Sequence, residues 1–223
     1  MTISLIFMSA LMLVVAWWII KQTVNTQPWE AKAGHPEIGR FSGRSLPQPN
    51  SKLGLFVFLA VVTSLFSLFI SAYMMRMELG DWRPLSDPGL LWWNSAALVL
   101  SSIALQWALI ATKKNQIETV RNGMVLGGFF AIAFMAGQLI AWQQLIASGY
   151  IAQSNPANAF FYLITGLHAL HLLGGLVVWS MTTIKLLAGV ELERLRLSVE
   201  LCAFYWHFLL VIWVILFSLL LST

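Results

Sequence analysis

Charge is absent from five long stretches of this chain. They are residues 1–20, 53–75, 88–112, 122–184 and 201–223, none of which contains Asp, Glu, Lys or Arg. The chain of 223 residues is 59% hydrophobic and 10% charged, whereas a soluble domain carries about 25% charged residues. An apolar stretch of about 20 residues can cross a bilayer as a helix. We therefore predict an integral membrane protein with an all-α fold.

The fourth stretch, residues 122–184, is long enough to hold two helices. Gly149 and the segment 154–158, which contains Pro156, supply turn-forming residues near its middle, and such clusters mark a turn. The sequence thus predicts a polytopic membrane helix bundle with six transmembrane helices. We expect a transmembrane anchor in residues 1–21, a connecting segment in 22–52 and a five-helix bundle in 53–223. The expected helices of that bundle are 53–75, 90–112, 123–146, 159–187 and 200–221.

Basic residues are distributed unevenly between the connecting segments. Of the 13 Lys and Arg residues, all except Arg76 and Arg83 lie in segments 21–52, 113–121 and 185–199. Loops rich in Lys and Arg stay in the cytoplasm, so we expect both termini on the periplasmic side. The formal net charge of +4 then reflects orientation and contact with anionic lipid headgroups. It does not indicate nucleic-acid binding.

Three histidines and one glutamate lie within the expected helices. His168 and His171 are three residues apart, and Glu200 and His207 are seven apart, so each pair lies on one helix face. Ionisable residues inside a bilayer are candidates for function. Three interpretations remain open: a structural hydrogen-bonded network between helices, proton handling or lipid headgroup binding, and a metal site. Because the last two helices are joined by a short loop, we expect the four residues to cluster between them.

Uncharged polar residues also recur at helical spacing. Asn94 and Ser101 are seven residues apart, and Ser102 lies on an adjacent stripe, seven residues after Ser95; we interpret Asn94, Ser101 and Ser102 as interhelical hydrogen-bonding residues. The single cysteine, Cys202, excludes an internal disulfide and a paired-cysteine metal site. The chain contains no Ser-His-Asp arrangement and no glycine-rich phosphate loop, so we predict no catalytic residue.

Two segments resemble the signature segments of a known family. Residues 165–171, TGLHALH, and Glu200 followed by residues 204–208, FYWHF, are similar to subunit III of the haem-copper terminal oxidases, above all cytochrome c oxidase. Further similarity is found in residues 52–60 and 94–102, so that the resemblance covers residues 52–223.

The resemblance implies a bacterial form of this subunit, located in the inner membrane. It implies an accessory chain without haem, copper or other metal, which packs against catalytic subunit I and is accompanied by subunit II and small subunits. Haem and copper are expected in those partners. The resemblance also implies bound phospholipid and support of proton uptake while O2 is reduced to water. His168, His171, Glu200 and His207 would be buried polar positions, some of them near lipid.

Two positions depart from the family pattern. Val62 and Leu210 stand where the family usually has membrane-embedded carboxylates, which weakens any proton-collecting role that depends on those acids. The expected helices contain only three histidines, too few to ligate the haems and copper of an oxygen-reducing centre. We therefore expect the catalytic chemistry in a partner chain.

Other assignments remain open at this stage. The chain could belong to a quinol oxidase or a nitric oxide reductase, because other subunits choose the electron donor and the gas. A free-standing membrane transporter is a further alternative. Transporters often contain internal repeats and broken helices, but we find no repeat here and no expected helix interrupted by proline.

Overall fold

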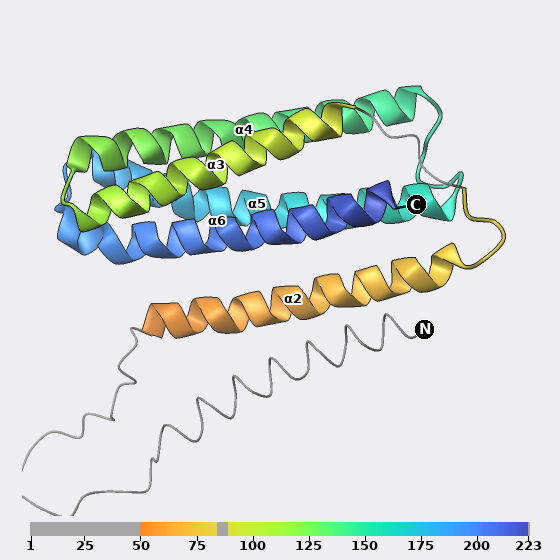
Figure 1. The fold of residues 1–223 in the computed structure, drawn as a ribbon, viewed down its shortest axis with the longest axis horizontal. Coiled ribbons are helices and arrows are strands. Elements are labelled where there is room, and N and C mark those ends of the chain that lie inside the picture. The colour runs from red at the N-terminus through yellow and green to blue at the C-terminus, as the bar shows by residue number, and fades with distance from the viewer. Residues whose placement is uncertain (1–49, 84–88, 223) are drawn as a thin grey trace, which may run out of the picture. The chain divides into compact units, whose positions relative to one another are not determined.

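The computed structural model describes residues 50–83 and 89–222, and this part of the chain is helical with no strand. Its helices are α2 (Asn50–Met77), α3 (Leu90–Lys113), α4 (Ile117–Ala147), α5 (Pro156–Leu187) and α6 (Leu192–Leu221) (Figure 1). All five are long and apolar enough to cross a membrane. The prediction of an all-α, multi-pass membrane protein is confirmed. The predicted anchor in residues 1–21 and most of the connecting segment lie outside the described residues.

The chain divides into two compact units between Met75 and Arg76. The first contains nearly all of α2. In this helix the hydroxyls of Thr63 and Ser67 donate to the carbonyl oxygens of Leu59 and Thr63, at 2.7 and 2.8 Å. Such bonds to the preceding turn satisfy hydroxyl groups where lipid offers no partner.

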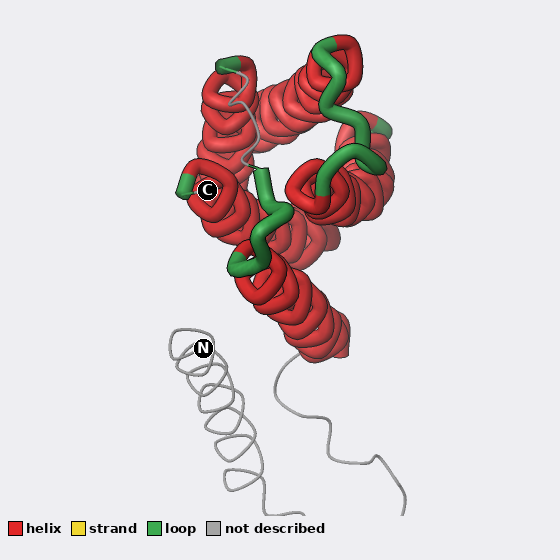
Figure 2. The backbone as a smooth tube through the Cα atoms, turned by 90° about the vertical axis from the view of Figure 1, so that its right-hand side faces the viewer, coloured by secondary structure: helices red, strands yellow, loops and turns green. Residues whose placement is uncertain are grey.

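The second unit is a ring of four helices. α3 packs against α4 and α6, and α5 packs against the same two helices. Figure 2 shows these helices nearly end-on, around a common axis. Short connections between α3 and α4 and between α5 and α6 make those pairs antiparallel neighbours.

Two helices begin more than one full turn earlier than the sequence indicated. α4 begins at Ile117 instead of residue 123, and α6 begins at Leu192 instead of residue 200. The added turns carry the ion pairs Glu118–Arg121 at 2.6 Å and Glu191–Arg194 at 3.2 Å. A charge-free stretch indicates only the part of a helix that lipid can surround. The helix itself, held by backbone hydrogen bonds, can extend beyond that stretch. An acidic residue near a helix N-terminus also interacts favourably with the helix dipole.

The predicted turn within residues 122–184 is confirmed, because α4 ends at Ala147 and α5 begins at Pro156. Asn155 caps α5 by accepting a hydrogen bond from the Ala157 amide at 3.3 Å. Its own side-chain amide donates to the carbonyl oxygen of Arg83 at 2.5 Å. The segment before α3 and the segment before α5 are thereby joined at one end of the bundle.

An ion pair orders the segment that follows α2. The guanidinium of Arg76 donates to both carboxylate oxygens of Asp81. These hydrogen bonds hold the pKa of the Asp81 carboxyl below its ordinary value.

Glycines allow the bundle helices to approach closely. A Cβ atom at Gly123 would lie 2.8 Å from the Cβ of Ala108, and one at Gly127 would lie 2.7 Å from the Leu105 side chain. Both contacts join α4 to α3. Between α5 and α6, a Cβ atom at Gly175 would lie 2.6 Å from the ring of Tyr205. The helix axes can therefore be this close only because glycine, which has no Cβ atom, occupies these positions.

Candidate functional site

An aromatic layer lies at the centre of the four-helix bundle. The imidazole of His168 on α5 is fully buried, and its centroid lies 5.2 Å from the Trp213 ring on α6 and 6.0 Å from the Phe134 ring on α4. Phe134 and Trp213 meet edge to face with centroids 4.9 Å apart, a favoured geometry for aromatic pairs. This layer spans the bundle diagonal from α4 to α6 and packs around the histidine.

The same layer is connected to α3 by a hydrogen bond. The indole Nε1 of Trp213 donates to the hydroxyl of Ser95 at 2.9 Å, and that hydroxyl donates to the carbonyl oxygen of Leu91 at 2.8 Å. All four helices thus contribute to one layer. The bond from Trp213 to Ser95 joins α6 to α3 within this layer.

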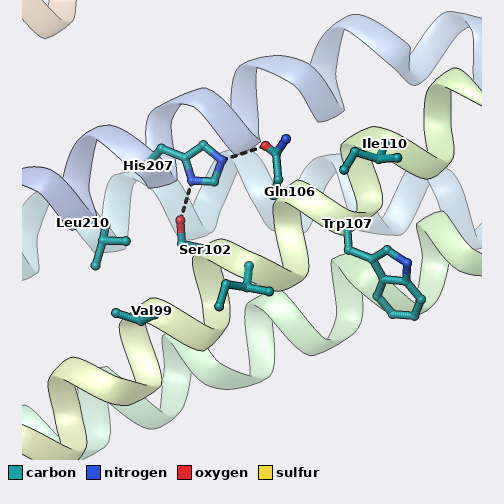
Figure 3. A pocket seen from close by; sticks show the side chains of 8 residues that line it. Val99, Ser102, Gln106, Trp107, Ile110, His207 and Leu210 are labelled. Atoms are coloured by element: carbon teal, nitrogen blue, oxygen red, sulfur yellow. Dashed lines mark hydrogen bonds between the residues drawn. The ribbon is translucent and has the colours of Figure 1, made fainter.

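His207 forms a second polar junction, between α6 and α3. Its Nε2 bonds to the Oε1 of Gln106 at 2.9 Å, and its Nδ1 bonds to the hydroxyl of Ser102 (Figure 3). Because an amide oxygen can only accept, Nε2 carries the proton, and Nδ1 of a neutral imidazole then accepts from Ser102. One imidazole therefore links two successive turns of α3 to α6.

Ser101 and Asn94 contribute to the packing of α3 against α4. The Ser101 hydroxyl donates to the carbonyl oxygen of Gly127 at 2.7 Å. Asn94 is buried, and its carboxamide fills the space beside Gly137. Ser101 and Ser102 are adjacent in sequence, yet they bind different neighbouring helices.

The other two candidate residues are His171, one turn after His168 on α5, and Glu200 on α6. The Nδ1 of His171 bonds to the carbonyl oxygen of Leu167 on its own helix at 2.7 Å, and the Tyr205 hydroxyl donates to the carbonyl oxygen of His171 at 2.9 Å. Glu200 is half-buried near the start of α6. Within residues 50–83 and 89–222, no three His, Cys, Asp or Glu side chains come together as a possible metal site.

A shallow groove opens beside the His207 junction. It encloses about 340 Å³ and is lined by Val99, Ser102, Ile103, Gln106, Trp107 and Ile110 of α3, and by His207 and Leu210 of α6. Figure 3 shows His207 reaching from α6 to the two polar residues of α3, with Leu210 one turn further along α6. Leu210, a position where the resemblance leads one to expect an acid, contributes apolar lining instead.

The family model described as cytochrome c oxidase subunit III matches residues 48–222. The chain belongs to the cytochrome c oxidase subunit III family. Its matched region includes all of α2 to α6 as the structure describes them.

Named relatives agree with this family assignment. The chain is 29% identical over 180 residues to cytochrome c oxidase subunit 3 of Thermostichus vulcanus, covering 75% of this chain and 85% of the relative. It is 27% identical over 182 residues to a protein of Nocardia farcinica named "Probable cytochrome c oxidase subunit 3", covering 78% and 89%. A subunit 3 of Synechocystis sp. is 27% identical over 192 residues, covering 83% and 76%. The predicted function, a subunit III of a haem-copper oxidase, is confirmed.

Sequence reasoning placed the polar residues on the correct helices but missed several of their partners. Phe134 and Trp179 were not singled out, although Trp179 donates to the carbonyl oxygen of Met124 at 2.9 Å and occupies the space above Gly128. The sequence signal that could have identified this contact is a large aromatic residue, Trp179, on one helix and a glycine, Gly128, on the neighbouring helix. The bond of Gln106 to His207 had no sequence signal beyond the four-residue spacing of Gln106 from Ser102.

Proposed function

We propose that this member of the subunit III family is an accessory chain without redox chemistry of its own. It packs against the catalytic subunit, stabilises that subunit, binds phospholipid and supports proton uptake during the reduction of O2 to water. Haem and copper are held by the partner subunits. Subunit I is the main partner, with subunit II and smaller subunits in the same complex.

The packing of His168 and the hydrogen bonds of His207 support the proposal. His168 is enclosed by the Phe134 and Trp213 rings, and both ring nitrogens of His207 bond to α3. An imidazole that ligates haem iron or copper needs a ring nitrogen directed at the metal. His207 uses both nitrogens in holding α6 to α3, which favours a structural role.

We further propose a location in the bacterial inner membrane with both termini periplasmic. The distribution of Lys and Arg supports this orientation: Lys113 and Lys114 end α3, Lys185 lies in the last turn of α5, and Arg194 and Arg196 lie near the start of α6. Residues 1–21 would form an additional anchor and residues 22–52 a cytoplasmic connection.

Selective removal of this chain from the purified oxidase tests the accessory role. We expect the remaining complex to keep its haem absorption spectrum, because the haem ligands lie in other chains. Its turnover should decline faster during continuous assay than that of the intact complex, and adding the chain back should restore sustained turnover. Haem that leaves with the removed chain would contradict the proposal, as would unchanged turnover.

A further inference from the structure

Two carboxamide side chains are buried in the bundle with unpartnered polar atoms. Gln138 on α4 is 2% exposed, and neither its Oε1 nor its Nε2 has a hydrogen-bond partner among residues 50–83 and 89–222. Asn94 on α3 is 4% exposed, and its Nδ2 has no partner in the same ranges. A buried amide without a partner costs free energy, and lipid offers it no hydrogen bond. These three atoms therefore point to a bound ligand.

The two carboxamides lie at the same level of the bundle. α3 and α4 lie side by side (Figure 1), and a Cβ atom at Gly137 would lie 3.0 Å from the Nδ2 of Asn94. Gly137 directly precedes Gln138, and consecutive Cα atoms are about 3.8 Å apart. Gln138 also follows Phe134 by four residues, so both side chains lie on the inner face of α4. One ligand can thus contact Asn94 and Gln138 together.

The surroundings of the carboxamides define the chemistry of this ligand. Residues 88–112 and 122–184 contain no Asp, Glu, Lys or Arg, and a buried ion without a charged partner is very costly. The ligand is therefore neutral. The two amide nitrogens donate and the Oε1 of Gln138 accepts, so the ligand has both acceptors and donors. Because the three atoms are enclosed by protein, it is also small. Water meets all three requirements, and a buried water typically makes about three hydrogen bonds.

We propose that Asn94 and Gln138 form an internal water site between α3 and α4. An ordered water accepts a hydrogen bond from the Nδ2 of Asn94 and donates one to the Oε1 of Gln138, and the Nε2 of Gln138 donates to the same site. The site lies one turn from Phe134, on the side of the aromatic layer that faces the turn between α4 and α5. It connects α3 to α4 within this chain, so it does not depend on the proposed function.

A density map of the intact oxidase in which ordered water is visible tests the site directly. We expect a water peak within hydrogen-bond distance, about 2.7–3.2 Å, of both carboxamides. A direct hydrogen bond between Asn94 and Gln138 with no water would overturn the site. The same conclusion would follow if neither carboxamide had a water peak beside it, or if a lipid or a partner chain supplied the bonding group.

Radiolytic labelling provides a second arm with a matched control. A short X-ray pulse converts ordered water into hydroxyl radicals, and mass spectrometry measures the label on Phe134, which is fully buried and one turn from Gln138. We expect Phe134 to be labelled in the wild-type complex and the label to fall several-fold in Gln138→Leu, which removes a water ligand. Gln144→Leu, which replaces an exposed glutamine of the same helix, should leave the label unchanged.

The labelling outcomes decide the inference separately from the proposed function. An unlabelled Phe134 in the wild type, or a label that Gln138→Leu leaves unchanged in an assembled complex, overturns the water site. If Gln138→Leu prevents assembly, Asn94→Leu removes the other ligand and is compared in the same way. Assembly of each variant is verified by its haem spectrum. Absence of haem from the purified wild-type sample would instead contradict the accessory-subunit proposal.

Discussion

His168 and His207 show how neighbouring residues determine the role of a membrane histidine. His168 is fully buried between the rings of Phe134 and Trp213, so it acts chiefly as a packed aromatic residue. His207 is half-buried and bonds through both nitrogens to Ser102 and Gln106. The sequence analysis treated both histidines as members of one polar cluster, because spacing shows which helix face a residue lies on but not which side chains it meets on the facing helix.

A glycine pair in α5 tests the close packing of α5 against α6. We expect Gly175→Ala to lower the unfolding midpoint of the complex in mild detergent, because the new methyl group would lie 2.6 Å from Tyr205 and 2.8 Å from Trp206. Overpacking of this kind costs about 1–3 kcal/mol.

The adjacent Gly174 supplies the control for this substitution. It has no atom within 4 Å of an added Cβ, so Gly174→Ala should leave the midpoint unchanged or raise it slightly, given the higher helix propensity of alanine. Equal effects of the two substitutions would show that α5 and α6 are not packed as described.

At the scale of helices, the sequence predicted which segments cross the membrane but not which helices touch. The five described spans follow from hydropathy alone, and the turn at residues 148–155 follows from Gly149, Asn155 and the adjoining Pro156, which begins α5. The bonds from His207 to α3 could not be predicted, because the loops connect α6 to α5 and not to α3. The sequence interpretation instead placed His207 in a cluster with the histidines of α5.

A double-mutant cycle measures the bond between α3 and α6. We expect Ser102→Ala and His207→Leu each to destabilise the complex and to be non-additive together, because each removes one end of the same hydrogen bond. Interhelical hydrogen bonds in membranes contribute about 0.6 kcal/mol on average and up to about 1.7 kcal/mol. Unfolding in detergent with increasing denaturant gives the required free energies.

Ser101 provides the matched control for the cycle. Its hydroxyl bonds to Gly127 on α4 and shares no partner with His207. Ser101→Ala and His207→Leu should therefore be additive to within about 0.3–0.5 kcal/mol. Strong coupling of His207 to Ser101 and none to Ser102 would refute the junction.

For the molecule as a whole, the proposed orientation rests on the ends at which basic residues gather. The turn between α3 and α4 and the turn between α5 and α6 lie at the same end of an antiparallel bundle, and both are basic at the preceding helix end. At the opposite end, the segment before α3 contributes Arg83, whose carbonyl oxygen accepts a hydrogen bond from Asn155. The proposed orientation therefore places the C-terminus after α6 in the periplasm.

Reporter fusions at the C-terminus test this orientation. Alkaline phosphatase fused after Thr223 should be active, because it folds only in the periplasm. Green fluorescent protein fused at the same position should not fluoresce, because it would be exported unfolded. Fusions after Lys114 should give the reverse result. A fluorescent C-terminal fusion together with an inactive phosphatase fusion would invert the proposed topology.

The central claim is that this chain acts only as part of a haem-copper oxidase whose redox centres lie in other chains. Purification of the tagged chain from its own membranes in mild detergent, followed by an optical spectrum and separation of the subunits, measures this directly. We predict haem absorbance in the purified complex and none in this chain after separation. A chain that purifies alone without haem, or one that retains haem after separation, would contradict the account.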